Sequence, residues 1–208
     1  MQLENYYWYF DNVLSKNFCN NLIKYGNSLR EKQALTLGMK DEDVEDNKRL
    51  DNLKKIRNSN IAWLDGRWLY DELFHFVQIA NNNAGWNYQW DWAEQCQFTK
   101  YKLNQFYNWH IDSHPKPYTQ QGPLQGKIRK LSMIVQLSDP KDYVGGDIEF
   151  DFRKNTPEDK QKIVQATEVI PQGSIVVFPG FVWHRVKPVT QGTRYSLVMW
   201  CCGRPWQW

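Results

Sequence analysis

The sequence of 208 residues has little of several features, and each shortage excludes a class of protein. It contains no run of about 18 apolar residues, so no segment is expected to cross a membrane as a helix. Its formal net charge is only +3, far from the strongly basic balance of a dedicated nucleic-acid binder. It also lacks a stretch of linker composition. With 41% hydrophobic and 15% aromatic residues, residues 1–208 are expected to bury one core as a single domain.

Cysteine is also scarce, and its spacing argues against a cross-linked or zinc-stabilised fold. The four cysteines, Cys19, Cys96, Cys201 and Cys202, form no CxxC motif. We therefore expect reduced and mostly buried thiols, which suits a reducing compartment. The first residues, MQLENYYWYFDN, have neither a basic start nor a cleavable apolar core. The expectation is a soluble, cytoplasmic protein.

Helical patterns lie in the first half of the sequence and strand patterns in the second. Ser15 can cap a helix that ends at Gly26, and the spacing of apolar residues predicts an amphipathic helix over residues 68–81. Short β-branched and aromatic runs follow from about Gln95 to the end. We therefore predict a mainly β protein with supporting helices (α+β), in which residues 1–94 are mostly helical support and residues 95–208 form the β core.

Three polar or glycine-containing segments are read as connections. Residues Lys40–Lys55 are acidic and then basic with few apolar residues, which predicts an exposed helix or a mobile loop. Thr156–Lys162 is expected to form a capped helical turn or a loop. Gly145 and Gly146 precede a strand, where glycine is expected to serve backbone geometry and not phosphate binding.

The triplet His110-Ile-Asp112 is a candidate pair of metal ligands. Residues at i and i+2 of a strand point to the same side, so both side chains can reach one ion, and the distant His184 can complete the set. Two imidazoles and one carboxylate on one face of an octahedron leave the opposite face open, which is typical of Fe(II) oxygenases. His114 could replace His110 in a shifted arrangement, but Pro115 marks the end of that strand. The remaining histidine, at position 75, lies beside the apolar stripe of the predicted helix and is expected to pack or face solvent.

The C-terminal segment predicts two strands, Ser174–Phe178 and about Thr193–Trp200, with His184 between them. The two strands are expected to pair with each other. Alternation places four residues on one face of the second strand, namely Arg194, Ser196, Val198 and Trp200. A buried arginine is costly unless it binds a carboxylate through two hydrogen bonds. The natural guest for Arg194 is the distal carboxylate of a small keto diacid that chelates the metal; the alternative is a rim residue paired with a nearby acid.

Three stretches of the sequence resemble the iron(II)- and 2-oxoglutarate-dependent dioxygenases of the prolyl 4-hydroxylase and PKHD type. They are YKLNQFYNWHID (Tyr101–Asp112), RKLSMIVQLSDPKDYVGGDIEF (Arg129–Phe150) and GSIVVFPGFVWHRVKPVTQGTRYSLVMW (Gly173–Trp200). Upstream, RNSNIAWL (Arg57–Leu64) resembles the lead-in of the same group. The pieces occur in the order typical of that superfamily.

The resemblance implies a double-stranded β-helix, which is a jelly-roll or cupin-like fold. It implies that His110, Asp112 and His184 bind Fe(II) and that Arg194 binds the far carboxylate of 2-oxoglutarate. Tyr101 and Ser196 are implied at the same carboxylate. On the substrate side we place Tyr107, Arg129 and Trp183, with a surface position in the basic cluster Lys127–Lys130 as the alternative for Arg129.

Two positions depart from the family pattern. Asn104 stands where a glycine is common in a turn, and asparagine is the residue most tolerant of left-handed backbone after glycine. Arg194 stands where the collagen and algal prolyl 4-hydroxylases have lysine, which groups the chain with the hypoxia-sensing type and bacterial relatives.

Three functions remain open at this point. The leading hypothesis is an Fe(II)- and 2-oxoglutarate-dependent hydroxylase, with ascorbate as a further cofactor, that acts on a prolyl residue of a protein or peptide and releases succinate and CO2. A second hypothesis keeps the chemistry but changes the substrate to a free amino acid, another small metabolite or a nucleobase; the modest charge argues against long nucleic acids. The third is a noncatalytic binding module, against which the complete set of ligands and anchor argues.

Overall fold

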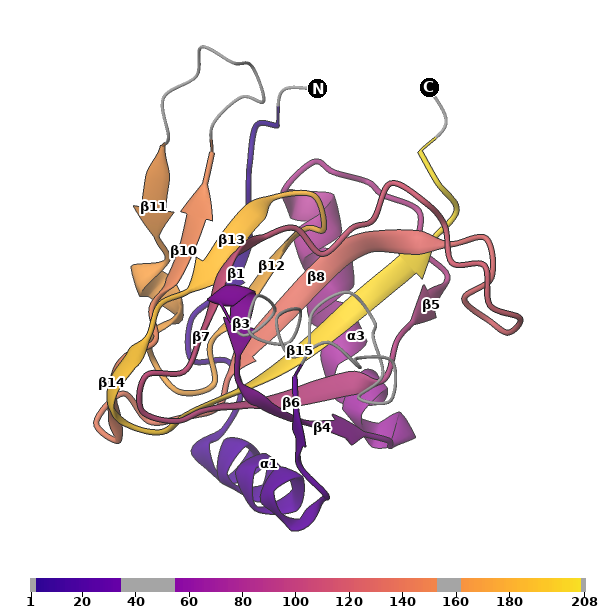
Figure 1. The fold of residues 1–208 in the computed structure, drawn as a ribbon. Coiled ribbons are helices and arrows are strands. Elements are labelled where there is room, and N and C mark those ends of the chain that lie inside the picture. Colours follow the sequence, from indigo (N-terminus) through magenta and orange to yellow (C-terminus); the bar gives the residue numbers. More distant parts are fainter. Residues whose placement is uncertain (1–2, 35–54, 153–161, 207–208) are drawn as a thin grey trace.

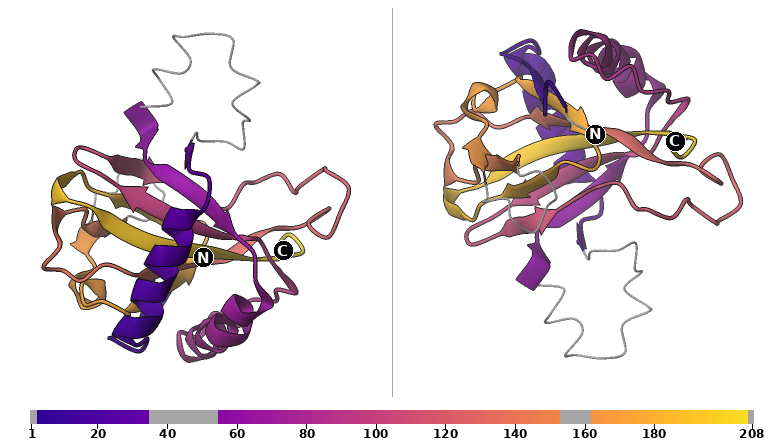
Figure 2. Two further views of the ribbon diagram at one scale, coloured as in Figure 1. Left: turned by 90° about the horizontal axis from the view of Figure 1, so that it is seen from below. Right: turned by 90° about the horizontal axis from the view of Figure 1, so that it is seen from above.

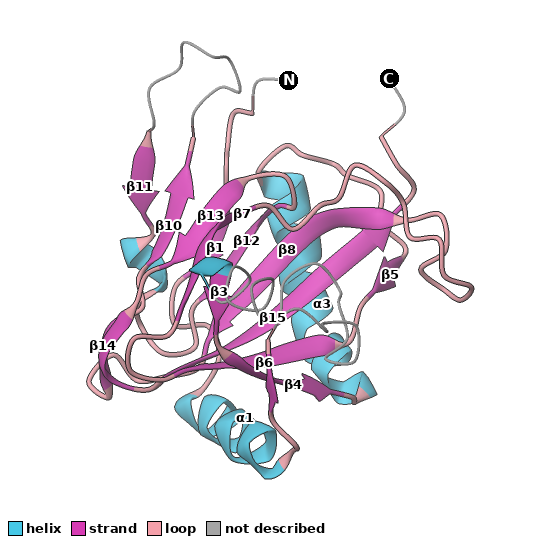
Figure 3. Cartoon of the chain, in the orientation of Figure 1, coloured by secondary structure: helices cyan, strands magenta, loops and turns pink. Residues whose placement is uncertain are grey.

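The computed structural model describes residues 3–34, 55–152 and 162–206. Apart from Lys55 and Lys162, the predicted polar segments 40–55 and 156–162 lie outside these residues, as the predictions for them do. The described chain is built mainly of strands, with two α-helices at the periphery (Figures 1 and 3). The mainly β architecture with supporting helices is therefore confirmed.

The larger sheet has eight strands in the order β1-β12-β8-β15-β6-β4-β2, with β5 also paired to β15. Its strands are β1 (Trp8–Phe10), β2 (Lys32–Gln33), β4 (Asn60–Leu64), β5 (Trp92–Ala93), β6 (Cys96–Tyr101), β8 (Ile128–Gln136), β12 (Ile175–Pro179) and β15 (Arg194–Gly203). Four of these strands come from the first 94 residues, so that region adds edges to the sheet in addition to its helices.

The second sheet has five strands in the order β11-β10-β13-β7-β3. They are β3 (Arg57–Asn58), β7 (Phe106–His110), β10 (Ile148–Asp151), β11 (Ile163–Gln165) and β13 (Trp183–Val186). A separate pair, β9 (Tyr143–Gly145) and β14 (Val189–Gly192), forms a two-stranded sheet, and a short 3-10 helix, η2, covers Thr167–Val169.

Helices α1 (Lys16–Ser28) and α3 (Arg67–Asn83) lie along one side of the larger sheet (Figure 2). The Ser15 hydroxyl accepts a hydrogen bond from the backbone N–H of Phe18, so the predicted N-cap of α1 is confirmed. Helix α3 covers the predicted amphipathic segment. No helix among the described residues is long and apolar enough to span a membrane.

Two apolar clusters lie on the two faces of the larger sheet. One joins it to the helices, through residues such as Leu22 of α1, Leu73 of α3 and Met133 of β8. The other joins it to the five-stranded sheet, through Phe178 and Phe150 among others. The two sheets therefore pack face to face, and the polar residues described below lie between them.

The structure differs from the sequence-based predictions in two local respects. Strands β12 and β15 do not pair with each other, because β8 lies between them and pairs with both. His184 belongs to β13 of the other sheet, since the chain changes sheets between β12 and β15. Helix α1 also continues past Gly26 to Ser28.

Gly26 is required for packing and not for a helix cap. A Cβ atom on this buried residue would lie 2.5 Å from the Cγ atom of Phe98, whose ring is buried in β6. The helix therefore approaches the sheet as closely as a glycine allows.

We predict that Gly26→Ala destabilises the protein by about 1–3 kcal/mol, because the overpacked methyl group outweighs the better helix propensity of alanine. The free energy of unfolding from urea denaturation measures this change. The exposed neighbour Asn27→Ala serves as control and should not destabilise the protein. A gain in stability for Gly26→Ala would show that α1 can move away from Phe98.

Candidate active site

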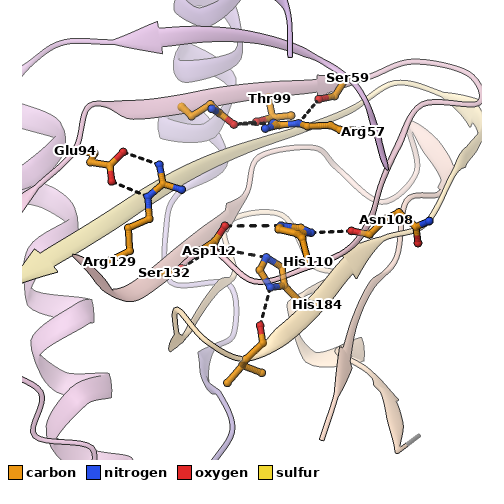
Figure 4. A network of polar contacts seen from close by, with 12 residues as sticks. Arg57, Ser59, Glu94, Thr99, Asn108, His110, Asp112, Arg129, Ser132 and His184 are labelled. Carbon is orange, nitrogen blue, oxygen red and sulfur yellow. Dashed lines mark hydrogen bonds and ion pairs between the residues drawn. The ribbon is translucent and has the colours of Figure 1, made fainter. Parts of the chain in front are cut away.

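His110, Asp112 and His184 come together between the two sheets (Figure 4). His110 ends β7, and its register partner on β13 is His184. Asp112 follows in the loop after β7. Its two carboxylate oxygens lie 3.7 Å from His110 Nε2 and 3.6 Å from His184 Nε2. In the described part of the chain, no other set of three or more such side chains is grouped closely enough to hold a metal ion.

Both imidazoles are held in the orientation that a metal ligand needs. His110 Nδ1 lies 2.7 Å from the carbonyl oxygen of Asn108, and His184 Nδ1 lies 3.0 Å from that of Val182. A carbonyl oxygen only accepts, so each Nδ1 carries the proton and each Nε2 keeps a free lone pair. The register of β13 against β7 shifts between His184 and Val186, in the same stretch of β7 that contains Asn108. The two free lone pairs point to the carboxylate.

Asp112 is fixed by a side chain of β8 and by the turn that follows β12. The Ser132 hydroxyl of β8 donates a hydrogen bond of 2.7 Å to Asp112 Oδ2. The backbone N–H groups of Asp112 and Ser113 both donate to the carbonyl oxygen of Gly180 at 2.8 Å. A Cβ on Gly180 would lie 3.1 Å from the carbonyl oxygen of Arg129, so glycine lets this turn approach β8 closely.

The protonation states suit a divalent cation. Burial lowers the pKa of His110 well below its ordinary value, and His184 lowers it further. Burial alone would raise the pKa of Asp112, but the two neighbouring imidazoles bring it down to about 2. A neutral imidazole and an ionised carboxylate are the forms that bind metal, so protons do not compete at these two positions near neutral pH.

Arg194, the first residue of β15, is 1% exposed and lines the same cavity as the three side chains. Its Nε donates to Gln136 Oε1 at 3.1 Å, whereas Nη1 and Nη2 are buried without a hydrogen-bond partner in the described structure. Burying a guanidinium end without partners is costly, and a carboxylate would satisfy both nitrogens at once. These two atoms therefore fit a carboxylate-bearing cofactor.

The other predicted cofactor contacts lie beside Arg194. Tyr101 of β6 is its register partner, and Ser196 is two residues further along β15. Both are buried and line the cavity with Val198 and Trp200, as the predicted alternation of β15 requires. Burial raises the pKa of the Tyr101 phenol, so it stays protonated and can donate a hydrogen bond. Left-handed backbone at Asn104, with φ of 63°, confirms the predicted turn between β6 and β7.

The structure adds a second cavity arginine that the motifs did not single out, Arg57 of β3. Its Nε donates to the Ser59 hydroxyl at 2.9 Å, and its Nη2 donates to Gln97 Oε1 at 2.7 Å (Figure 4). Its guanidinium lies 4.4 Å from the Tyr107 ring centroid, and that ring stacks on His110. Only its place in the lead-in stretch Arg57–Leu64 could have indicated it from sequence.

The three residues predicted on the substrate side are placed differently from one another. Tyr107 lines the cavity against His110, and burial raises its pKa to about 12. Arg129 is paired with Glu94 through two hydrogen bonds of 2.6 and 2.7 Å and stacks on Trp200, so it is not a surface residue. Trp183 precedes His184 on β13 and alternation turns it to the opposite face, so it does not line the cavity.

The four cysteines are buried and none forms a disulfide. His75 is exposed on α3, and His114 is exposed after the triplet. The predictions of free, buried thiols and of a packing or solvent-facing His75 agree with these positions.

Comparison with known proteins agrees with this geometry. The sequence model of the 2OG-Fe(II) oxygenase superfamily matches residues 96–202, which is just over half of the chain. A PKHD-type hydroxylase of Xanthomonas axonopodis pv. citri is 29% identical over 103 residues, or 50% of this chain and 41% of that protein. One from Escherichia coli is 30% identical over 103 residues, or 50% of this chain and 40% of that protein. The match thus spans less than half the length of these relatives.

Solved structures share the fold. A Pseudomonas putida prolyl-4-hydroxylase has a TM-score of 0.63 at 19% identity, over 97% of this chain and 95% of that one. A viral collagen prolyl hydroxylase from Paramecium Bursaria Chlorella virus-1, solved with 2OG, has a TM-score of 0.61 at 17% identity, over 96% of this chain and 97% of that one. A Trichoplax adhaerens prolyl hydroxylase, solved with a hypoxia inducible factor peptide, has a TM-score of 0.58 at 19% identity, over 95% of this chain and 84% of that one. The predicted double-stranded β-helix is confirmed.

We predict that Asp112→Ala weakens Mn(II) affinity by more than about 100-fold. Loss of a direct ligand should exceed the roughly 10–100-fold effect of losing a hydrogen-bond partner of a ligand. Calorimetric titration of the metal-free protein measures this affinity. His114→Ala is the matched control, because it removes an exposed side chain two residues away. An equal loss of Mn(II) affinity in the two variants would refute the assignment of His110, Asp112 and His184 as the metal ligands.

Proposed function

Because this chain belongs to the 2OG-Fe(II) oxygenase superfamily, we propose that it holds Fe(II) on His110, Asp112 and His184 and 2-oxoglutarate on Arg194, and that it hydroxylates an unactivated C–H bond. One observation carries the proposal. The buried Nη1 and Nη2 atoms of Arg194 lack a partner in the described structure, and they line the same cavity as the three candidate ligands. A site with the two terminal guanidinium nitrogens of an arginine beside a facial set of metal ligands suits a chelating keto diacid.

The side chains of the cavity would divide the work of binding. Arg194 would take the distal carboxylate through two charge-assisted hydrogen bonds, and the neutral phenol of Tyr101 would add a third donor. Ser196 and its register partner Thr99 supply hydroxyls next to this position. Ile134, Val186 and Val198 form apolar walls that keep bulk water away from the bound groups.

When bound, Fe(II) and 2-oxoglutarate would supply the oxidative chemistry, in which one oxygen atom of O2 enters the substrate and the other enters succinate as CO2 is released. The protein's own part is placement. Asp112 and the two imidazoles would hold Fe(II) from one side, and the keto acid and O2 would then bind from the other.

For the substrate we propose a prolyl residue in a protein or peptide. Beyond the metal site, the inner face of the larger sheet continues as an aromatic surface. Trp200 has a buried indole N–H without a partner among the described residues, and its ring lies 6.3 Å from that of Trp63. Trp63 is 40% exposed, and Trp92, paired with Cys202 at the sheet edge, is 43% exposed. An extended peptide could stack its prolines on these rings and accept a hydrogen bond from Trp200.

The Arg129–Glu94 pair supports the same reading. Arg129 is held by both oxygens of Glu94 and stacks on Trp200 at 3.8 Å, so the Trp200 ring that lines the cavity is held in place before a substrate arrives. The relatives are named hydroxylases of the PKHD type, and one solved neighbour carries a peptide. A small metabolite would need only the inner cavity and would leave the tryptophans unused.

Two further parts of the proposal concern conditions. We propose ascorbate as a reductant that maintains Fe(II), and a cytoplasmic location, where the four free cysteines would stay reduced. A free amino acid, another small metabolite or a nucleobase remains the alternative substrate, and a noncatalytic binding module is the alternative of a different class.

We predict a weak visible absorption band when Fe(II) and 2-oxoglutarate are added without oxygen, and its loss in Asp112→Ala. Absence of the band in folded wild-type protein would favour the binding module.

For Arg194→Ala we predict a fall in 2-oxoglutarate affinity of at least about 100-fold with Mn(II) affinity nearly unchanged, because a charge-assisted bidentate contact is lost far from the metal ligands. Unchanged 2-oxoglutarate affinity in Arg194→Ala would refute the role of Arg194 in binding the distal carboxylate.

We predict that proline-containing peptides stimulate succinate release, whereas free amino acids do not. In this assay Trp63→Ala should raise the KM for the peptide at least about fivefold, since stacking of a proline ring on an exposed indole is worth roughly 1 kcal/mol. Peptide-independent turnover of 2-oxoglutarate should not change. Trp68→Ala, at an exposed tryptophan on α3, is the control. If free amino acids stimulated succinate release and peptides did not, the alternative of a free amino acid as substrate would be favoured over the peptide.

A further inference from the structure

We propose that Gln136 and Tyr143 position the Arg194 guanidinium, and that this positioning decides which chain length of 2-oxo diacid the cavity accepts. The inference rests on the proposed function and deepens it, because it assigns a selectivity to residues that contact neither the metal position nor the substrate. Neither residue was singled out from the sequence. One buried amide, that of Gln136, has three hydrogen-bond partners.

The amide of Gln136 has a single allowed orientation. Its Oε1 accepts from Arg194 Nε at 3.1 Å, and its Nε2 donates to the Ser138 carbonyl oxygen at 3.2 Å and to the Tyr143 hydroxyl at 2.9 Å. Arginine can only donate and a carbonyl can only accept, so exchanging the amide oxygen and nitrogen would break both contacts. Gln136 is 1% exposed, so water cannot replace the lost partners.

This orientation decides which edge of the guanidinium is free. An arginine can grip a carboxylate side-on through Nε and one Nη, or end-on through Nη1 and Nη2. Because Gln136 occupies the Nε–H of Arg194, only the end-on fork remains, and its two nitrogens are the buried atoms without partners. A bound carboxylate is therefore expected at the far tip of the side chain.

The stem of Arg194 is fixed as well. A Cβ on Gly146 would lie 2.9 Å from Arg194 Cδ and 3.6 Å from Tyr143 Cε2, so the stem rests on a position where only glycine fits. Gly146 has a φ of +66°, which glycine adopts without strain. Gly145 and Gly146 thus serve backbone geometry, as predicted, and Gly146 also makes room for the arginine.

The cavity consequently has two fixed ends. One is the group of His110, Asp112 and His184, and the other is the end-on fork of Arg194. A 2-oxo diacid must chelate at the first end and place its second carboxylate at the other. Oxaloacetate is one methylene too short and 2-oxoadipate one methylene too long. Freeing the guanidinium from Gln136 would let the fork move and would reduce the penalty for either length.

The test compares three diacids by anaerobic calorimetric titration of the Mn(II)-loaded 208-residue protein. For the wild type we expect 2-oxoglutarate to bind at least about tenfold tighter than oxaloacetate or 2-oxoadipate. In Gln136→Leu we expect at least about tenfold weaker 2-oxoglutarate binding, a selectivity reduced to about threefold or less, and unchanged Mn(II) affinity. A general loss of structure would weaken all three diacids alike and would not change their ratio.

Gln172→Leu is the matched control. Gln172 is also buried and also donates through its amide, to the Leu137 carbonyl oxygen at 2.8 Å and to Asn20 at 3.0 Å, but neither of these partners is Arg194. It should leave both affinity and selectivity unchanged. Tyr143→Phe removes one oxygen from a half-buried residue and should reduce selectivity in the same direction; it carries the test if Gln136→Leu does not fold.

The outcomes separate the two proposals. Wild-type protein that binds Mn(II) but none of the diacids would overturn the proposed function and this inference with it. Tight 2-oxoglutarate binding by the wild type, with the same affinity and diacid ratio in folded Gln136→Leu or Tyr143→Phe, would overturn the inference and leave the proposed function standing.

Discussion

Antiparallel pairing of β7 with β13 is the constraint on which the site depends. It places His184 directly opposite His110, although the two residues are far apart in the chain. The register irregularity next to His184 accompanies the contact of His110 Nδ1 with the Asn108 carbonyl, which leaves Nε2 free. Asp112 then needs only the turn after β7 to reach both imidazoles, and Gly180 holds that turn through two backbone hydrogen bonds. One strand pairing thus organises all three side chains.

The charges around the cavity are unevenly compensated, and this imbalance indicates what the cavity binds. Arg129 is neutralised by Glu94 and packs against the cavity residue Trp200. Arg57 has neutral partners, Ser59 and Gln97. Arg194 has one neutral partner and two buried nitrogens with none in the described structure. A buried positive charge of this kind is tolerated when an anionic ligand completes it, which agrees with a dicarboxylate as co-substrate.

Local features of the fold were predictable where short-range physics decides them. The hydroxyl of Ser15 caps α1, and the alternation of β15 turns Arg194, Ser196, Val198 and Trp200 to the cavity. The end of α1 was not predictable, because Gly26 has the usual signature of a helix terminus while its actual role is contact with Phe98 of β6. The pairing of β12 with β15 was wrongly expected for a similar reason. Adjacent strands in sequence often pair, but here β8 from an earlier part of the chain pairs with both.

The kinds of side chain in the site and the faces they share follow from the amino-acid order, because alternation along a strand and the donor chemistry of His, Asp and Arg are local properties. The partners of those side chains depend on how distant segments pack. Glu94 meets Arg129, Gln136 occupies the Nε of Arg194, and Trp183 turns away from the cavity while its neighbour His184 points in. These relations depend on which strands lie side by side and in what register. Pairings between distant segments leave no trace in the local sequence pattern.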